Sequence, residues 1–212
     1  QCESIDTVTV SGPAAFSFSM SAIDVTCNGA NNGSASAILG GVPSFTYLWS
    51  NGDTTQTISS LSPGSYSVSV TDSNGCSLSD SILITEPDLL MIDSAVVNNT
   101  VCFGGNTGSI DISVSGGTPL YSYSWSNGDT SEDISSLTAG SYSISVTDLN
   151  QCSSISYSYT ITEPTQIQNI PLVTSVLCFG GNDGSIDISV TGGMPSYSYL
   201  WSNGATTEDI TT

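Results

Sequence analysis

The chain has 212 residues, with 19 Asp and Glu and no Lys, Arg or His, so its formal net charge is −19. Without basic side chains it lacks a histidine general base and a phosphate-binding lysine or arginine, so we expect no enzyme. The same lack argues against nucleic acid and anionic membranes as partners, because both are bound mainly through Lys and Arg. No stretch approaches the roughly 20 apolar residues of a membrane span, so we expect no direct membrane insertion.

The sequence repeats with a period of 76 residues, the spacing that separates Trp49, Trp125 and Trp201. We expect four parts in chain order: the tail of one repeat over 1–13, full repeats over 14–87 and 88–164, and the N-terminal part of a further repeat over 165–212. The incomplete copies at both ends predict neighbouring repeats on either side.

Within each repeat the hydrophobic pattern predicts short strands. In the second copy "GSIDISVSGG" from 108 alternates Ile110, Ile112 and Val114 with polar residues, which indicates a half-buried strand. "YSYSW", "TSEDISSL" and "GSYSISV" follow as further strands, separated by turn sequences such as "GGTP", "SNGD" and "TAGS". Short strands at this spacing are typical of an antiparallel sandwich. The first copy has "GSASAILGG", one residue shorter, which predicts a changed bulge or register.

The six cysteines are far apart in the sequence: Cys2, Cys27, Cys76, Cys102, Cys152 and Cys178. No CxxC pair occurs and histidine is absent, so disulfides in an oxidising compartment are favoured over a zinc site. This spacing therefore predicts an extracellular protein.

Two disulfide pairings fit the sequence. If consecutive strands alternate in direction, the cysteines before and after the four strands of a repeat fall at the same end. That predicts Cys27–Cys76 and Cys102–Cys152, each closing a loop of about 50 residues worth about 4 kcal/mol, with Cys2 and Cys178 bonded to partners outside the segment. The alternative links neighbours along the chain: Cys2–Cys27, Cys76–Cys102 and Cys152–Cys178.

Long motifs in the chain resemble the SprB repeat, which occurs in very large cell-surface proteins of Bacteroidota. They are "CFGGNTGSIDISVSGGTPLYSYSWSNG" (102–128), "LTAGSYSISVTDLNQC" (137–152) and "YTITEP" (159–164). The first copy departs from the pattern at "NGANNGSASAIL", where the strand aspartate is absent. The resemblance implies export by the type 9 secretion system and a filament or stalk attached to the outer membrane, as for a gliding-motility adhesin.

The stretch "L-x-x-G-S-Y", at 61–66 and 137–142, resembles the tyrosine corner of immunoglobulin-like modules. The predicted fold is therefore a tandem array of Ig-like antiparallel β-sandwiches, one per 76 residues. We expect a structural and adhesive array whose partners are neighbouring repeats and a surface polysaccharide or substratum, bound through many weak sites. The alternatives are a Ca²⁺-dependent glycan-binding module and a self-assembling filament or sheath subunit.

The tryptophans and aspartates are the candidate ligand-binding residues. Trp49, Trp125 and Trp201 suit sugar stacking, but they share strand parity with neighbouring tyrosines, which favours core positions. Carboxylates are Ca²⁺ ligands, and the best candidates are Asp72, Asp111, Asp148 and Asp187. No EF-hand spacing occurs, and "DSNG" and "NDGS" are also ordinary turn sequences. Calcium is therefore an open cofactor prediction.

Four sites fit the Bacteroidota O-glycosylation pattern, in which Asp precedes Ser or Thr and then a small or aliphatic residue. The predicted acceptors are Thr7, Thr54, Ser81 and Ser94. Sugars at these positions would shield strand edges.

Overall fold

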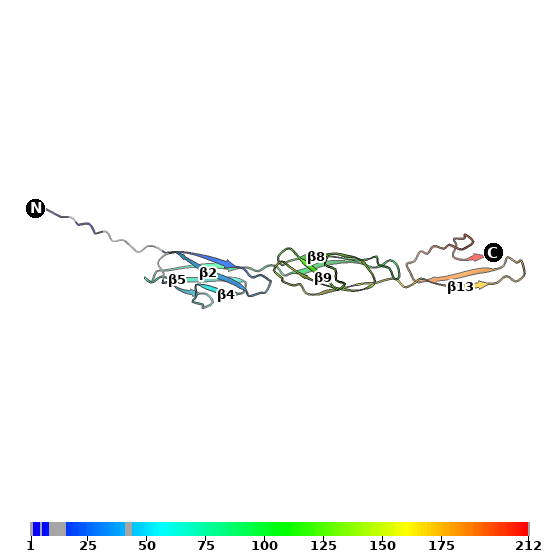
Figure 1. The fold of residues 1–212 in the computed structure, drawn as a ribbon, viewed down its shortest axis with the longest axis horizontal. Coiled ribbons are helices and arrows are strands. Elements are labelled where there is room, and N and C mark those ends of the chain that lie inside the picture. The colour runs from blue at the N-terminus through cyan, green and yellow to red at the C-terminus, as the bar shows by residue number, and fades with distance from the viewer. Residues whose placement is uncertain (1, 5, 9–15, 41–43, 212) are drawn as a thin grey trace. The chain divides into compact units, whose positions relative to one another are not determined.

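The structure is a computed structural model that describes residues 2–4, 6–8, 16–40 and 44–211. The described residues form β-strands and turns without a helix, as the sequence predicts. The chain divides into two compact units: residues 1–89 with 116–118, and residues 90–115 with 119–212. Figure 1 identifies the strands by colour along the chain.

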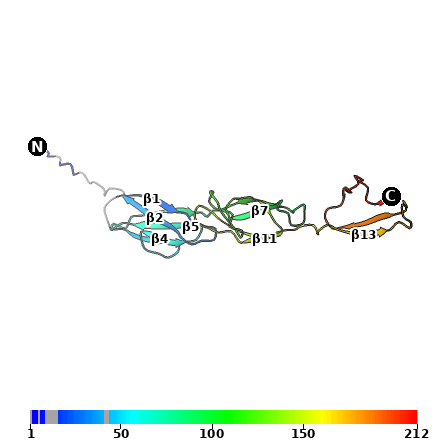
Figure 2. The ribbon, with the colours of Figure 1, turned by 45° about the vertical axis from the view of Figure 1, so that its right-hand side comes forward.

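The first full repeat is a sandwich of two three-stranded antiparallel sheets (Figure 2). One sheet has the order β1-β2-β4, with the bounds Ser17–Ile23, Gly33–Gly40 and Thr57–Leu61. The other has the order β3-β5-β6, with the bounds Thr46–Trp49, Gly64–Thr71 and Ser77–Ile84. Every second side chain of a strand faces the other sheet, and these inward side chains are mostly apolar. Short strands with this alternation are therefore enough to build a core between the two sheets.

The second full repeat has the same arrangement. Its first sheet has the order β10-β8-β7, with the bounds Ile134–Leu137, Gly108–Ser115 and Met91–Asn98. Its second sheet has the order β12-β11-β9, with the bounds Tyr157–Ile161, Gly140–Thr147 and Ser122–Trp125. The predicted alternation is confirmed here, because Ile110 and Ile112 are buried while Asp111 between them is exposed.

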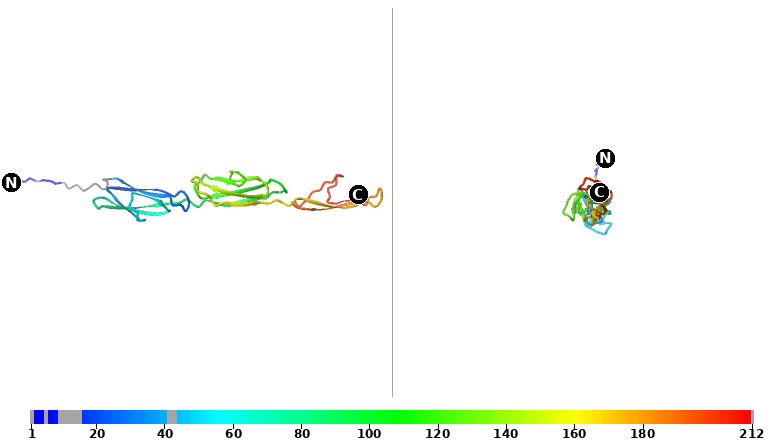
Figure 3. Two further views of the ribbon diagram at one scale, coloured as in Figure 1. Left: turned by 60° about the horizontal axis from the view of Figure 1, so that its bottom comes forward. Right: turned by 90° about the vertical axis from the view of Figure 1, so that its right-hand side faces the viewer.

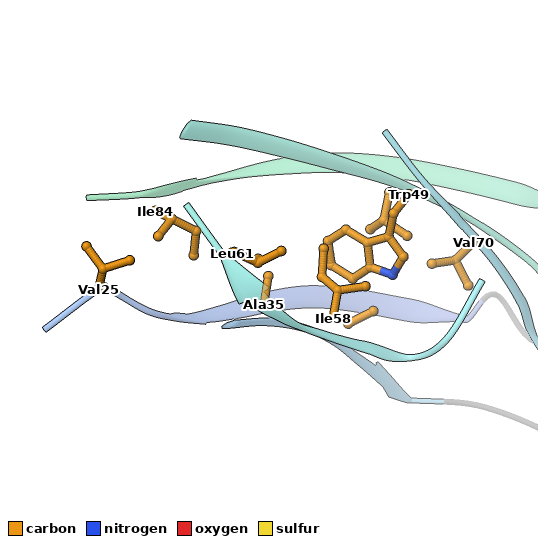
Figure 4. Packing of buried hydrophobic residues seen from close by; sticks show 9 residues of the cluster. Val25, Ala35, Trp49, Ile58, Leu61, Val70 and Ile84 are labelled. Carbon is orange, nitrogen blue, oxygen red and sulfur yellow. The ribbon is translucent and has the colours of Figure 1, made fainter. Parts of the chain in front are cut away.

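Each sandwich encloses one apolar core. In the first repeat the buried side chains are Val25, Ala35, Ala37, Trp49, Ile58, Leu61, Val68, Val70 and Ile84 (Figure 4). In the second they are Ile92, Ile110, Ile112, Trp125, Ile134, Leu137, Ile144, Val146 and Ile161. Both sheets contribute side chains to each cluster, so each core is formed between the two sheets of one sandwich.

The chain enters each sandwich at one end and leaves it at the other. Ser17, at the start of β1, pairs with Gly40 at the end of β2. Ile84, at the end of β6, lies at the opposite end of β2, where its Cγ2 is 2.9 Å from the position of a Cβ on Gly33. The rise along β2 separates these ends by about 23 Å. The second sandwich repeats this arrangement between the start of β7 and the end of β12.

The strand "TSEDISSL" does not run as the sequence predicts. Only Ile134–Leu137 forms strand β10, and it pairs antiparallel with β8 in the opposite sheet. The chain reverses just after Trp125, where the Gly128 N–H donates to the Trp125 carbonyl at 2.9 Å, and then crosses to the other sheet. Strand β10 is antiparallel to β8, and β9 is antiparallel to β11. Because β8 and β11 both begin beside Ile161, β9 and β10 run in the same direction, and the alternation assumed above is broken.

The predicted difference in bulges between the copies is present, but on the neighbouring strand. Strands β1 and β2 pair without interruption, whereas β7 is irregular between Ile92 and Ser94 opposite β8. A second bulge is common to both copies, at Ser60 in β4 and Ser136 in β10. These serines have φ values of 57° and 58°, in the left-handed region.

The third copy contains one sheet of order β13-β14-β15, with the bounds Gln168–Thr174, Ser185–Thr191 and Ile210–Thr211. These strands correspond to the first sheet of the other copies. The positions that would correspond to β11 and β12 lie beyond the residues that the structure describes.

Candidate functional site

Both full repeats contain a tyrosine corner. The Tyr66 hydroxyl donates to the Ser62 carbonyl, and the Tyr142 hydroxyl donates to the Thr138 carbonyl, each at 3.0 Å. A tyrosine that bonds back to the backbone a few residues upstream is a hallmark of Ig-like sandwiches. The expectation drawn from "L-x-x-G-S-Y" is confirmed in both copies.

The tryptophans of the full repeats lie in the core. Trp49 is 2% exposed and Trp125 is 3% exposed, and Figure 4 shows the Trp49 ring among aliphatic side chains. Their indole N–H groups donate to backbone carbonyls of Thr55 and Ser131 at 2.8 and 2.9 Å. Sugar stacking on these two rings is therefore excluded in the folded repeat. Trp201 is half-buried.

The glutamate of "ITEP" fixes a loop that we call the exit loop, residues 24–32 in the first repeat and 99–107 in the second. Glu86 accepts a hydrogen bond from the Gly29 N–H, and Glu163 accepts one from the Gly104 N–H, each at 2.6 Å. Carboxylate acceptors make stronger bonds than neutral ones. The glutamate thus ties the exit loop to the segment through which the chain leaves the sandwich, a role that the sequence analysis missed.

A second loop, which we call the entry turn, joins β5 to β6 over residues 72–76 and β11 to β12 over residues 148–152. An Oδ1 of Asp72 accepts the N–H groups of Asn74 and Cys76 at 2.8 and 2.9 Å. Asp148, which is 1% exposed, makes the equivalent two bonds at 2.9 Å. Both aspartates therefore stabilise a turn through their side chains. This is the role that the sequence analysis gave as the alternative to calcium binding.

The four candidate calcium ligands are not brought together. Asp111 and Asp187 are exposed on β8 and β14, whereas Asp72 and Asp148 are in two different entry turns. Within the parts of the chain that the structure describes, no three His, Cys, Asp or Glu side chains are close enough to hold a metal ion. Calcium binding at these aspartates therefore stays a prediction.

The predicted disulfide pairings are wrong. Cys27 and Cys152 are disulfide-bonded, whereas Cys2, Cys76, Cys102 and Cys178 are free and exposed. A Cys27–Cys76 or Cys102–Cys152 bond is prevented because each repeat holds these residues at opposite ends. Cys27 lies in the exit loop, and Cys76 ends the entry turn, beyond the far end of β5. The prediction failed because it assumed alternating strand directions. The alternative between neighbours fails because it needs Cys76 and Cys102 bonded to each other.

The tight turn after the core tryptophan contains an aspartate whose ionised form is stabilised by hydrogen bonds within the turn. The Thr55 hydroxyl donates to Asp53 at 2.7 Å and lowers the pKa of that carboxyl. The Ser131 N–H donates to Asp129 at 2.9 Å and lowers the pKa of Asp129 in the same way. Hydrogen bonds donated to a carboxylate favour its charged form, so Asp53 and Asp129 stay ionised in mild acid.

Two half-buried tyrosines of the second repeat have raised pKa values. Burial, with the nearby charge of Glu132 second, raises the pKa of Tyr123 to about 12. Burial is likewise the cause of the raised pKa of Tyr159, whose ring is 6.3 Å from the ring of Trp125. These tyrosines pack against the core and complete it at its solvent side.

The four predicted glycosylation acceptors are all exposed. Thr7 precedes the first sandwich, and Thr54 follows the tight turn that begins at Trp49. Ser81 is on β6 and Ser94 is on β7. Their accessibility fits a modified side chain, and the modification itself stays a prediction.

The two-sheet strand order, the tyrosine corners and the buried tryptophans define the class: a protein built of tandem Ig-like β-sandwich repeats. The model of one family, described as the SprB repeat, matches three stretches that together make up half of the chain: residues 21–54, 94–130 and 172–206. The chain belongs to the SprB-repeat family. The first two matches each include an exit loop, and all three include the tight turn after a tryptophan.

Several solved structures are similar to this chain in fold class. A C-terminal fragment of intimin, solved with the intimin-binding domain of the translocated intimin receptor, is 17% identical, with a TM-score of 0.38, and the match covers 74% of this chain and 67% of that one. The N-terminal eight Ig domains of DSCAM are 14% identical, with a TM-score of 0.40, and the match covers 77% of this chain and 26% of that one. Sidekick-1 immunoglobulin domains 1–5 are 12% identical, with a TM-score of 0.36, and the match covers 86% of this chain and 46% of that one. The chain thus spans about a quarter of the DSCAM structure and under half of the Sidekick-1 structure.

No curated protein matches the chain. In the residues that the structure describes, no helix is long and apolar enough to cross a membrane.

Proposed function

We propose that the chain is a structural and adhesive segment of a long extracellular filament or stalk on a bacterial surface, as in a SprB-like gliding-motility adhesin. The observation that carries this proposal is the path of the chain through each sandwich, which starts at one end and finishes at the other. Domains with this path can be joined in series without a returning connection. Membership in the SprB-repeat family supports the surface setting.

The exposed surface supports weak, repeated contacts rather than one deep site. Many outward positions of the strands carry Ser and Thr, with single exposed apolar side chains such as Leu48 and Val96 between them. The sequence has no basic side chain to pair with its acidic ones. A surface of this kind offers hydroxyl donors and acceptors to a polysaccharide or a hydrated substratum. Many copies on one filament bind firmly through avidity even when each contact is weak.

The proposed location is the cell surface, after export by the type 9 secretion system and attachment to the outer membrane. Two observations support it. The family to which the chain belongs implies this route, and the disulfide-bonded state of Cys27 and Cys152 fits an oxidising compartment. Antibodies against the folded chain should label intact, unpermeabilised cells that make the protein.

The adhesive role is tested with beads that carry the folded chain at high or low density. Under flow on polysaccharide-coated glass, we expect high-density beads to stay attached and low-density beads to detach, because avidity requires several contacts. Beads with a reduced and alkylated, unfolded chain are the control. Equal detachment of all three would refute the adhesive role.

Two other outcomes would favour the alternatives. Tight binding of one saccharide class by a single chain, lost with EDTA, would favour a Ca²⁺-dependent glycan-binding module. A reduced surface protein that migrates near the 21.8 kDa of this chain would favour an assembled filament or sheath subunit.

A further inference from the structure

Asparagine followed by glycine is open to a chemical change that needs no enzyme. The glycine nitrogen attacks Cγ of the asparagine side chain, and it can approach closely because glycine has no Cβ. An N–Cγ bond forms, the Cγ–Nδ2 bond breaks, and ammonia leaves with the proton of the glycine amide. Water then opens the resulting five-membered succinimide to aspartate or isoaspartate, so a neutral amide becomes a carboxylate.

The sequence contains six Asn–Gly pairs, and the asparagine side chain is hydrogen-bonded in five of them. In the tight turns after the tryptophans the asparagine Oδ1 accepts the N–H two positions later at 3.0 or 3.1 Å: Asn51, Asn127 and Asn203. In the exit loop of the first repeat, Nδ2 of Asn28 donates to the Pro87 carbonyl at 3.1 Å, and Nδ2 of Asn32 donates to Oγ1 of Thr26 at 2.8 Å. Each bond fixes the side-chain amide and opposes the rotation that brings Cγ to the glycine nitrogen.

Asn74, in the entry turn of the first repeat, is the exception. The structure describes the whole of this turn, and within the described residues the exposed Asn74 side chain has no hydrogen-bond partner. The turn is closed by other groups: the Asn74 N–H donates to Oδ1 of Asp72 at 2.8 Å, and the Gly75 N–H donates to the Asp72 carbonyl. That second bond is 3.1 Å long, against 2.9 Å for the glycines of the tight turns, so the Gly75 nitrogen is also the less firmly held. Figure 3 shows the first repeat in blue and cyan, with turns at the ends of its strands.

The second repeat has the same turn without the reactive pair. There Asn150 is followed by Gln151, which has a φ of 66°, against 84° for Gly75. A side chain on this residue hinders the approach of its nitrogen to the preceding Cγ. The left-handed φ of Gln151 shows that the turn accepts glutamine at this position. The two repeats therefore differ at the residue that decides whether the reaction proceeds.

We propose that Asn74 is a site of spontaneous deamidation and the first asparagine of the folded chain to become aspartate or isoaspartate. The product adds a carboxylate to a chain whose formal net charge is already −19. Isoaspartate also lengthens the backbone of the entry turn by one carbon, two residues before Cys76. The modification depends only on the geometry of this turn and not on the adhesive role proposed above.

The test is incubation of the folded chain at mildly alkaline pH, followed by reduction, proteolysis and mass spectrometry. Cleavage after acidic residues releases residues 73–80 as one peptide, and further cleavage after residue 74 distinguishes aspartate from isoaspartate. We expect Asn74 to react about fivefold faster than Asn51 and Asn127, the rate ratio that corresponds to one side-chain hydrogen bond of about 1 kcal/mol. In urea these bonds are lost, so the rates of the six pairs should converge.

Two variants of the entry turn serve as a matched pair. Gly75→Gln installs the residue of the second repeat and should suppress the reaction at Asn74. Ser73→Ala changes the residue on the other side of Asn74 and should leave the rate unchanged. Circular dichroism should show that both variants keep the strand content of the wild type.

Three results would overturn the proposal: an unmodified Asn74 after a time in which the unfolded chain has reacted, equal rates at Asn74 and Asn127 in the folded chain, or an unchanged rate in Gly75→Gln. None of these results bears on the bead assay, so the two proposals fail independently.

Discussion

At Gly108 the second sandwich has no room for a side chain. A Cβ there would lie 2.8 Å from Cγ2 of Ile161, 2.9 Å from the carbonyl oxygen of Leu137 and 3.4 Å from that of Asn98. Two of the three atoms belong to backbone on either side of β8, so neither can move without breaking strand pairing. Its backbone is not in the left-handed region, so the cost is one of crowding alone.

The substitution Gly108→Ala should therefore destabilise the second repeat by about 2 kcal/mol, within the usual cost of overpacking a core. For a unit of this size that corresponds to a fall in Tm of about 10 °C. Calorimetry of the whole chain measures it, and amide exchange assigns the loss to β8, β10 and β12. The first repeat should melt unchanged and serves as an internal reference.

Gly140→Ala is the matched control, because it is also a strand glycine of the second repeat. Its nearest neighbour would be Cε2 of Tyr142 at 3.9 Å, an ordinary contact. Alanine restricts the unfolded chain more than glycine does, so this variant should be neutral or slightly more stable. Equal Tm values for Gly108→Ala and Gly140→Ala would refute the crowding argument.

Glu163→Ala should destabilise the second repeat by about 1–2 kcal/mol in urea unfolding, because the Gly104 N–H loses its carboxylate acceptor; an unchanged midpoint would contradict a structural role for this bond. Cys76 should react with a maleimide in the native chain while Cys152, in the equivalent turn, should react only after reduction; labelling of Cys152 without reductant would contradict the disulfide. The raised pKa of Tyr123, about 12 against about 10 in an unfolded chain, means that the unfolded state loses this proton first. Its contribution to stability is thus complete below pH 10 and is lost between about pH 10 and 12. Tyr123→Phe should reduce the alkaline loss of stability over that window, and identical profiles for variant and wild type would refute the assignment.

The parts of the fold that depend on local pattern were predictable from the sequence. The alternation around Ile110 and Ile112 predicted β8 with its inward and outward faces, because strand period is a property of neighbouring residues. The tyrosine corner was predictable for the same reason, since Tyr142 bonds to a residue four positions away. The core position of Trp125 followed from its parity with Tyr123.

The parts that depend on residues far apart were not predictable. Glu163 bonds to Gly104, 59 positions earlier, and nothing in "ITEP" alone indicates that partner. The disulfide prediction failed at one crossing after Trp125, where a tight turn leads to the other sheet instead of a hairpin. Trp201 has the same local sequence as Trp125, but it is only half-buried, because burial depends on residues outside the local sequence.

The opposite placement of entry and exit in each sandwich also determines how the protein responds to being pulled. A force applied through the two ends of the first repeat runs along the strands, so the seven residue pairs between β1 and β2 are sheared together rather than peeled apart one at a time. Shearing requires many hydrogen bonds to break in a single step, which raises the barrier that governs forced unfolding. Each repeat is thus suited to carrying tension along its length.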